Sequence, residues 1–126
     1  MTEKNYLKIS QIEAYNISKD LSNFTWDIVL KWDYFARDTV GKQFVRAVDS
    51  ISANIAEGFG RFHKKVKIKF FQYSKGSVLE SYDWTEKSKH RNLITEDEYN
   101  ELLQTLQKLP KSINSLIKYT NDNLTI

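Results

Sequence analysis

The sequence contains no cysteine, one proline and four glycines among its 126 residues. Without cysteine, the chain can form neither a disulfide framework nor a thiolate metal site. So few glycines and prolines leave few positions for tight turns, and we therefore expect long helices rather than a β-sandwich. The single proline, Pro110, falls within an expected helix, where it removes a backbone hydrogen bond and is expected to bend the helix.

Long apolar runs are also missing from the chain. No stretch approaches the roughly 18 consecutive apolar residues of a membrane span. The first residues, MTEKNYLK, lack the apolar segment of a signal peptide. We therefore expect a soluble, cytoplasmic protein without a membrane partner. The length suits one domain over residues 1–126, with an ordered core at about residues 10–120 and loose ends at residues 1–9 and 121–126.

The motifs of several catalytic and cofactor-binding classes are absent. Neither a phosphate-binding GxxxxGK[ST] loop nor a GxGxxG turn after a strand occurs. The Glu-x-x-His pair of di-iron bundles is missing too, because Gly60 precedes His63 by three residues and Lys87 precedes His90 by three. Glu86 and His90, at spacing i and i+4, are expected to form a surface pair. We therefore expect no catalytic residue, cofactor or metal, and no enzymatic activity.

Apolar residues recur every three or four positions over four segments. These run from about residue 10 to Ala36, from a cap at Asp38 or Thr39 to Gly58 or Gly60, from Lys64 to Lys89, and onward from Thr95. The last begins with the capping box Thr95-Glu96-Asp97-Glu98 and continues with a heptad-like stripe. Four such helices with short links predict an all-α protein, an antiparallel up-down-up-down four-helix bundle.

The segment from Lys64 to Lys89 carries two apolar stripes. We expect the first to face the core; it consists of Val66, Phe70, Tyr73, Ser77 and Trp84. The second stripe, Phe71, Val78 and Tyr82, lies about 100° around the helix. It either widens the contact with the core or faces a neighbouring subunit, and we favour the oligomer interface.

Positive charge is concentrated after the second segment. No acidic residue occurs between Glu57 and Glu80, whereas the rest of the chain is net acidic. The run is either a solvated helix face or a patch that binds phosphates without choosing a sequence. The candidate nucleic-acid-binding residues are Arg61, Lys64, Lys65, Lys67 and Lys69, with Arg37, Lys42 and Arg46 as weaker candidates.

Two stretches carry a resemblance to a known family. Residues 46–61, RAVDSISANIAEGFGR, and the later Phe70 with Gly76-Ser77-Val78-Leu79-Glu80 resemble the four-helix-bundle proteins encoded in intervening sequences of bacterial 23S rRNA genes. The resemblance covers roughly residues 15–120. That family is similar to the accessory variability determinant of diversity-generating retroelements. The resemblance therefore implies a homopentamer with a basic surface, which binds nucleic acid and a reverse transcriptase.

The residues that carry the resemblance include a set of polar and small residues, which we interpret as a structural motif. The set consists of Asn54, Glu57, Gly58, Gly60, Gly76, Ser77 and Glu80. Gly58 and Gly60 are expected to end a helix through positive φ angles. Gly76 in mid-helix costs about 1 kcal/mol relative to alanine, which suggests close approach of another helix. We expect Asn54 and Glu57 to bond to Ser77, the Gly76 backbone or Arg61; a ligand site on the same residues is the alternative.

Two functions remain open from the sequence. The first is an oligomeric protein, without enzymatic activity, that binds RNA or DNA through phosphate contacts. The second is a protein-interaction adaptor, for example for a reverse transcriptase, in which the basic run only solubilises the surface and the contacts come from the second apolar stripe or the acidic start of the last helix.

Overall fold

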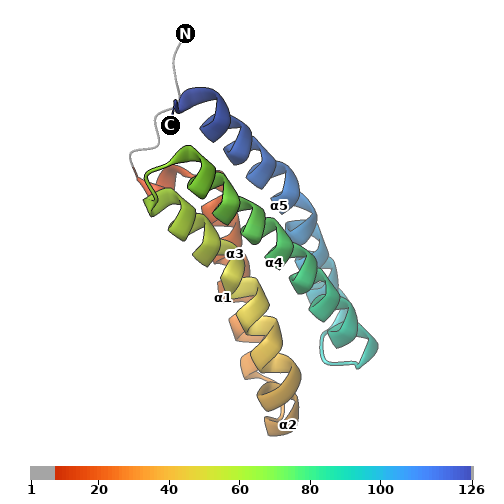
Figure 1. The fold of residues 1–126 in the computed structure, drawn as a ribbon. Helices are drawn as coiled ribbons and strands as arrows, with labels where there is room; N and C mark the ends of the chain where they lie inside the picture. The colour runs from red at the N-terminus through yellow and green to blue at the C-terminus, as the bar shows by residue number, and fades with distance from the viewer. Residues whose placement is uncertain (1–7, 126) are drawn as a thin grey trace.

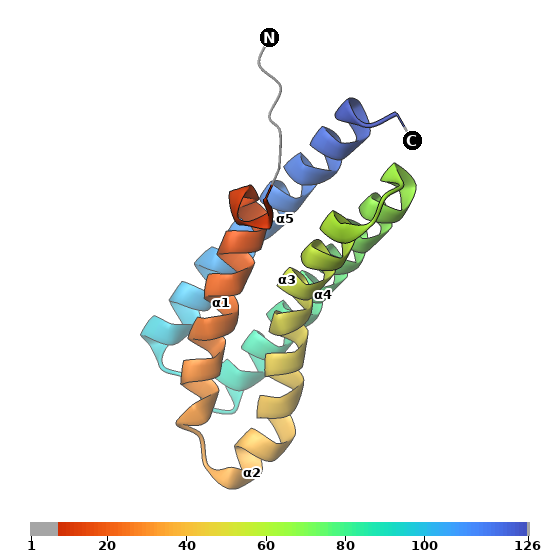
Figure 2. The ribbon, with the colours of Figure 1, turned by 90° about the vertical axis from the view of Figure 1, so that its left-hand side faces the viewer.

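The computed structural model describes residues 8–125. Its long helices are α1 (Glu13–Leu30), α3 (Lys42–Gly60), α4 (Lys64–His90) and α5 (Glu96–Asn123), and its short elements are η1 (Ile9–Gln11), α2 (Tyr34–Ala36) and the π-helical η2 (Arg37–Gly41). Successive long helices run in opposite directions (Figures 1 and 2). Each of α3 and α5 packs against both α1 and α4. The predicted all-α, up-down-up-down four-helix bundle is confirmed.

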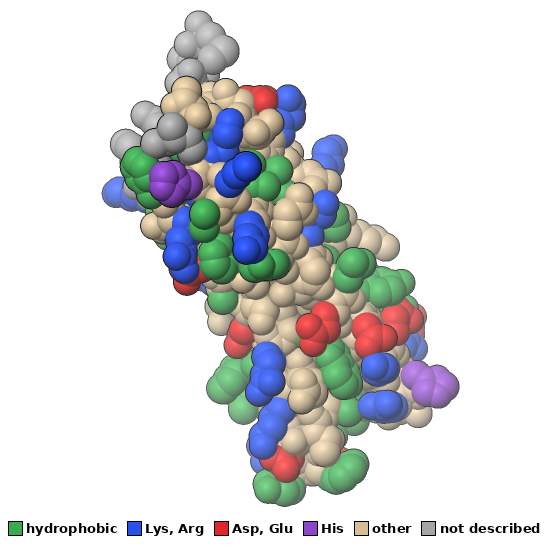
Figure 3. Space-filling model, in the orientation of Figure 1, with side chains coloured by type: hydrophobic (Ala, Val, Ile, Leu, Met, Phe, Trp, Pro, Cys, Tyr) green, Lys and Arg blue, Asp and Glu red, His purple; other side chains and the backbone are tan. Residues whose placement is uncertain are grey.

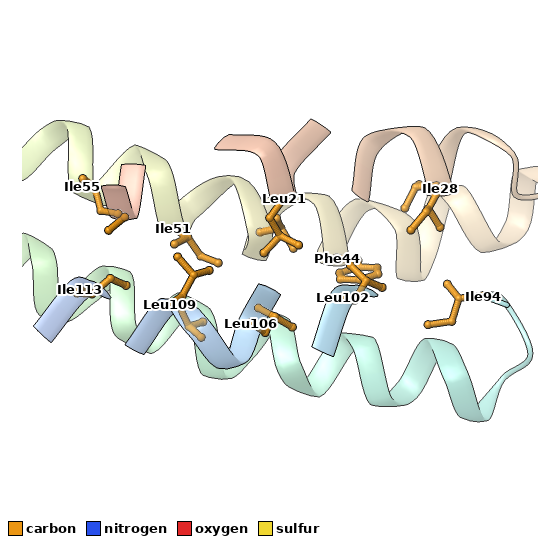
Figure 4. Close-up of a cluster of buried hydrophobic side chains, with 14 of the residues drawn as sticks. Leu21, Ile28, Phe44, Ile51, Ile55, Ile94, Leu102, Leu106, Leu109 and Ile113 are labelled. Carbon is orange, nitrogen blue, oxygen red and sulfur yellow. The ribbon is translucent and has the colours of Figure 1, made fainter. Parts of the chain in front are cut away.

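The core is a column of aliphatic side chains along the bundle axis (Figure 4). Helix α5 contributes the heptad-like stripe that the sequence predicted, with Leu102, Leu106, Leu109, Ile113 and Leu116 all buried. The helix is unbroken at Pro110 and continues to Asn123, three residues beyond the expected limit of the ordered core. Of the loose end expected at residues 1–9, residues 1–7 lie outside the described part of the chain.

The first turn of the bundle differs from the prediction. Helix α1 ends at Leu30 rather than near Ala36, and the next helix is capped by Asp33 rather than by Asp38 or Thr39. The Asp33 carboxylate accepts a hydrogen bond from the Ala36 amide at 3.0 Å. This cap starts a new helix within the segment that periodicity alone had joined to α1. α2, η2 and α3 then follow one another without a break.

Helix α4 turns a different face to the core than expected. Its buried residues are Phe71, Ser74, Val78, Ser81, Thr85 and Ser88, spaced alternately by three and four. Phe71 and Val78 are 2% and 4% exposed within the single chain, so their assignment to an oligomer interface was wrong. Tyr82, the third residue of that stripe, is 44% exposed. Tyr73, expected in the core, is 49% exposed.

Hydroxyl groups explain why the core face of α4 was missed. Ser81 Oγ donates to the Ser77 carbonyl at 2.7 Å, and Thr85 Oγ1 donates to the Ser81 carbonyl at 2.8 Å. Ser74 Oγ crosses to α3 and donates to the Ile51 carbonyl at 2.8 Å. Because these hydroxyl groups donate to backbone carbonyls, small polar residues can be buried in the core. A search for periodic apolar residues does not detect them.

Of the glycines in the predicted motif, Gly58 alone lies at a close helix approach, and none has a positive φ. Gly58 and Gly60 both lie inside α3, and neither has a positive φ; the helix ends where Arg61 becomes extended, at φ −81° and ψ 156°. A Cβ atom on Gly58 would lie 2.7 Å from the Phe71 ring and 2.9 Å from the Lys67 carbonyl oxygen. At Gly76 nothing lies within 4 Å, so the close approach expected there was also wrong. The tight helix crossing is at Gly58.

We predict opposite effects of alanine at these two glycines. Gly76→Ala adds helix propensity in open space and should raise the free energy of unfolding by up to about 1 kcal/mol. Gly58→Ala gains the same propensity, but it forces Phe71 and the α4 backbone apart, which typically costs about 1–3 kcal/mol. Urea unfolding followed by circular dichroism measures both. A Gly58→Ala variant as stable as Gly76→Ala would contradict the assigned crossing.

Candidate nucleic-acid interface

The candidate basic residues fall into two groups at opposite ends of α3. One group surrounds the turn from α3 to α4, and the other surrounds the start of α3 and contains Arg37, Lys42 and Arg46. At 1.5 Å per residue, Arg46 and Arg61 are separated by roughly 22 Å along the helix. Figure 3 shows basic side chains near both ends of the visible side of the molecule, with acidic side chains between them. The candidates therefore do not form one continuous surface.

The turn patch, as we name it, consists of Arg61, Lys64, Lys65 and Lys69. Lys65 and Lys69 are exposed on the first turns of α4. Lys64 Nζ lies 3.3 Å from the Asn121 carbonyl oxygen of α5, a long contact that leaves its ammonium open to solvent. Arg61 Nε donates to Glu57 at 2.8 Å across side chains that are about half exposed, and its remaining N–H groups are other possible donors.

Helix α4 begins in an unusual electrostatic setting. His63 is its N-cap residue and makes no side-chain capping bond, and the first turn contains lysines but no acidic residue. Helix α5 begins in the opposite way. Thr95 Oγ1 accepts a hydrogen bond from the Glu98 amide at 3.1 Å, and the Glu98 carboxylate accepts one from the Thr95 amide at 2.9 Å. The first turn of α5 contains three carboxylates. The predicted capping box is thus confirmed, whereas the positive end of α4 lacks a negative group in its first turn.

Lys67 has a structural contact that sets it apart from the turn patch. Its Nζ donates to the Phe59 carbonyl at 2.8 Å and lies 3.4 Å from the Gly58 carbonyl, so it binds the carboxyl end of α3. The ammonium also lies 5.8 Å from the centre of the Phe59 ring. Burial lowers the pKa of Lys67 below its usual value. Its role in nucleic-acid binding stays a prediction, and we leave Lys67 out of the turn patch because its ammonium already binds α3.

We predict that methionine at Lys67 and at Lys65 will differ in stability. Lys67→Met removes the ammonium that satisfies the last carbonyls of α3 and should cost about 1 kcal/mol of unfolding free energy. Lys65→Met removes an exposed charge and should stay within about 0.5 kcal/mol of the parent protein. Thermal or urea unfolding of both variants at neutral pH tests this. Equal stability of the two would show that Lys67 does not hold α3.

The predicted polar clamp forms only in part. The Glu57 bond to Arg61 is present, as expected, but Asn54 Nδ2 donates to the Ser50 carbonyl of its own helix at 2.9 Å. Ser77 Oγ likewise points back to the Tyr73 carbonyl at 3.3 Å. Glu80 is exposed. The α3–α4 crossing is bridged by Ser74 and Lys67, which the resemblance did not single out.

The second basic group surrounds an apolar groove that sequence reasoning missed. The groove has a volume of about 370 Å³, and its lining comes from α1, η2 and α3: Trp26, Val29, Leu30, Arg37, Gly41, Lys42, Val45 and Arg46. Trp26 and Leu30 are 54% and 51% exposed. They are two large apolar residues at spacing i and i+4 and therefore share one side of α1, which was the signal available in the sequence. Lys42 pairs with Asp38 at 2.8 Å, and the hydrogen bond raises the pKa of Lys42.

Titratable side chains elsewhere serve helix packing. Glu86, which the sequence paired with His90, accepts a 2.6 Å hydrogen bond from the Tyr99 hydroxyl, joining α4 to α5. This bond raises the pKa of Tyr99 to about 12. Over the described residues, no group of three or more His, Cys, Asp or Glu side chains is arranged to hold a metal ion. In the same part of the chain, no helix combines the length and apolar character that crossing a bilayer demands.

Comparisons with known proteins place the chain in a family. The family described as "23S rRNA-intervening sequence protein" matches residues 10–115, and the chain belongs to it. A crystal structure of a protein of unknown function from the S23 ribosomal protein family of Bacteroides thetaiotaomicron has the same fold, with a TM-score of 0.74 at 20% identity. The match covers 83% of this chain and 98% of that one. No curated protein matches the chain.

Proposed function

We propose that this protein binds RNA or DNA through phosphate contacts of the turn patch, as a binding protein rather than an enzyme, and that it acts as a homo-oligomer. The observation that carries the proposal is the basic, uncapped start of α4. Lysines in the first turn of a helix oppose the helix dipole, each at a cost of about 0.3–1 kcal/mol. A bound phosphate would reverse this penalty, because backbone N–H groups and lysines would then face a negative charge.

The surroundings of the turn patch support the same proposal. Glu57 is the nearest acidic residue before the patch in the sequence, and Glu80 is the first after it. The acids near the start of α5 lie at the opposite end of α4, as the antiparallel course of the helices requires (Figure 1). The name of the family refers to intervening sequences of 23S rRNA, and the structural neighbour belongs to the S23 ribosomal protein family. Both names are compatible with a nucleic-acid ligand.

Charge reversal tests the turn patch directly. Lys65→Glu with Lys69→Glu should lower the affinity for a 20-base-pair RNA or DNA duplex at least tenfold at 50 mM salt. Four phosphate contacts predict a slope of log K against log salt of about −3 to −4, and each lost lysine should reduce its magnitude by about 1. Fluorescence anisotropy at several salt concentrations measures both quantities.

The matched control is Lys108→Glu with Lys111→Glu, which makes the same change in net charge on exposed positions of α5. The affinity of this variant should fall only through the change in net charge. Its slope of log K against log salt should be nearly that of the parent protein. Equal losses in the two double variants would show that the turn patch has no special part, and the lysines of α4 would then be a solvated face.

We further propose that the chain self-associates through the apolar end of the bundle. Phe71 and Val78 are inside the core, so the subunit contact must use other residues. Tyr34 and Phe35 are 73% and 76% exposed, and they follow Trp26 and Leu30 in the turn after α1. Exposed apolar side chains in such number on one end typically mark an interface. Assembly would repeat the turn patch and raise affinity through effective concentration.

Substitution at the apolar end tests self-association. Trp26→Gln with Leu30→Glu should reduce the subunit number measured by light scattering, while circular dichroism confirms that the helices persist. Leu79→Glu, at a 74% exposed position on α4, is the control and should leave the subunit number unchanged. Loss of assembly only in the control would move the interface to the outer face of α4, beside Tyr82.

A protein-interaction adaptor is the second candidate function, favoured by the groove of Trp26 and Leu30 with its rim of Arg37 and Arg46. An apolar floor with a basic rim suits an amphipathic helix that carries acidic residues. A wild-type protein that stays monomeric and binds no nucleic acid would favour this candidate over the first.

A further inference from the structure

Aromatic rings lie among the basic residues at the start of α4 and in the turn before it. Phe62, directly after Arg61 in this turn, is 69% exposed, and Tyr73, two turns into α4, is 49% exposed. Basic and hydrophobic side chains are interspersed over this end of the molecule (Figure 3). A single exposed apolar residue is ordinary, but several exposed rings among charged side chains are typical of an interaction site.

The rings and cations are in contact with one another. The Arg61 guanidinium carbon lies 5.0 Å from the centre of the Phe70 ring, and the Phe70 and Tyr73 rings meet edge to face at 5.6 Å. Lys69 Nζ lies 6.0 Å from the centre of the Tyr73 ring. Arg61, Phe70, Tyr73 and Lys69 thus form a continuous strip in which a pair of rings lies between two cations.

Further rings and charges continue this strip into the turn. The Phe62 ring meets His63 edge to face, with ring centres 5.1 Å apart, so its position is held while most of its surface stays in water. His63 precedes the uncapped first turn of α4. In the chain, Phe62 thus lies between Arg61 and the lysines of the first turn of α4.

We infer that the turn patch recognises single-stranded rather than double-stranded nucleic acid, with Phe62 and Tyr73 as stacking platforms for bases; this inference rests on the proposed function. A duplex presents phosphates to a protein surface but keeps its bases stacked on each other, so exposed rings gain little from it. A single strand presents both phosphates and base faces. Exposed rings beside the turn patch match that combination, and stacking tolerates any base.

Because the strip contains both cations and rings, the contributions of phosphate contacts and of base stacking to binding can be measured separately. Lysine contacts depend on salt through counterion release, whereas stacking on a neutral ring does not. Removing rings should therefore weaken binding without changing the salt slope, and removing lysines should change the slope. Stacking of one base on a ring contributes to the binding free energy, and loss of one ring should therefore reduce affinity about tenfold.

Two variants and two probes test the inference. The probes are a fluorescently labelled 20-nucleotide oligo-uridine and a 20-base-pair RNA duplex, measured by anisotropy at 50 and 200 mM salt. Phe62→Leu with Tyr73→Leu keeps apolar surface but removes the exposed rings. Tyr82→Leu, an exposed tyrosine beyond Glu80, is the matched control. Light scattering confirms that the subunit number is the same in all three proteins.

We expect the double variant to lose at least tenfold affinity for oligo-uridine, to keep its affinity for the duplex, and to keep the salt slope of the parent. Tyr82→Leu should bind both probes as the parent does. If the double variant binds oligo-uridine normally, or loses both probes equally, the single-strand inference is overturned while phosphate binding stands. If the parent binds neither probe at 50 mM salt, the proposed function fails, and the inference with it.

Discussion

The close approach of α3 and α4 at Gly58 is the constraint on which the rest of the structure depends. The absence of a side chain there lets the Phe71 ring and the Lys67 carbonyl lie against α3. The same proximity brings the Lys67 ammonium to the last carbonyls of α3 and the Ser74 hydroxyl to Ile51. These contacts hold the first turns of α4, which carry the exposed Lys65 and Lys69, against the end of α3.

Much of the fold could be predicted from the sequence, and the predictions that were wrong have a common cause. Helix α5 was placed correctly because its core residues are leucine and isoleucine at regular spacing, behind a complete capping box. The core face of α4 was predicted wrongly because it is largely serine and threonine. The hydroxyls of Ser74, Ser81 and Thr85 donate to carbonyls of α3 and of the preceding turns of α4. The start of the helical run from α2 to α3 was misplaced because the local cap at Asp33 overrode a periodicity that continued through it.

The candidate site was predictable in its charge but not in its geometry. A run without acidic residues is visible in the sequence, yet nothing there separates Lys67, which binds α3, from Lys65, which is exposed two residues earlier. The separation of Arg37, Lys42 and Arg46 from the turn follows from the length of α3 once its start is known. The groove beside Trp26 depends on how the first turn of α3 packs on α1, which no spacing rule specifies.

The hydroxyl-lined face of α4 has a thermodynamic consequence for the whole chain. Ser74, Ser81, Thr85 and Ser88 occupy buried positions where many bundles place leucine. On unfolding, newly exposed apolar surface raises the heat capacity and newly exposed polar surface lowers it. The heat-capacity change per residue is therefore smaller than in a leucine-lined bundle of equal length. A smaller change gives a broader, flatter dependence of stability on temperature, so the fold loses stability slowly on either side of its optimum.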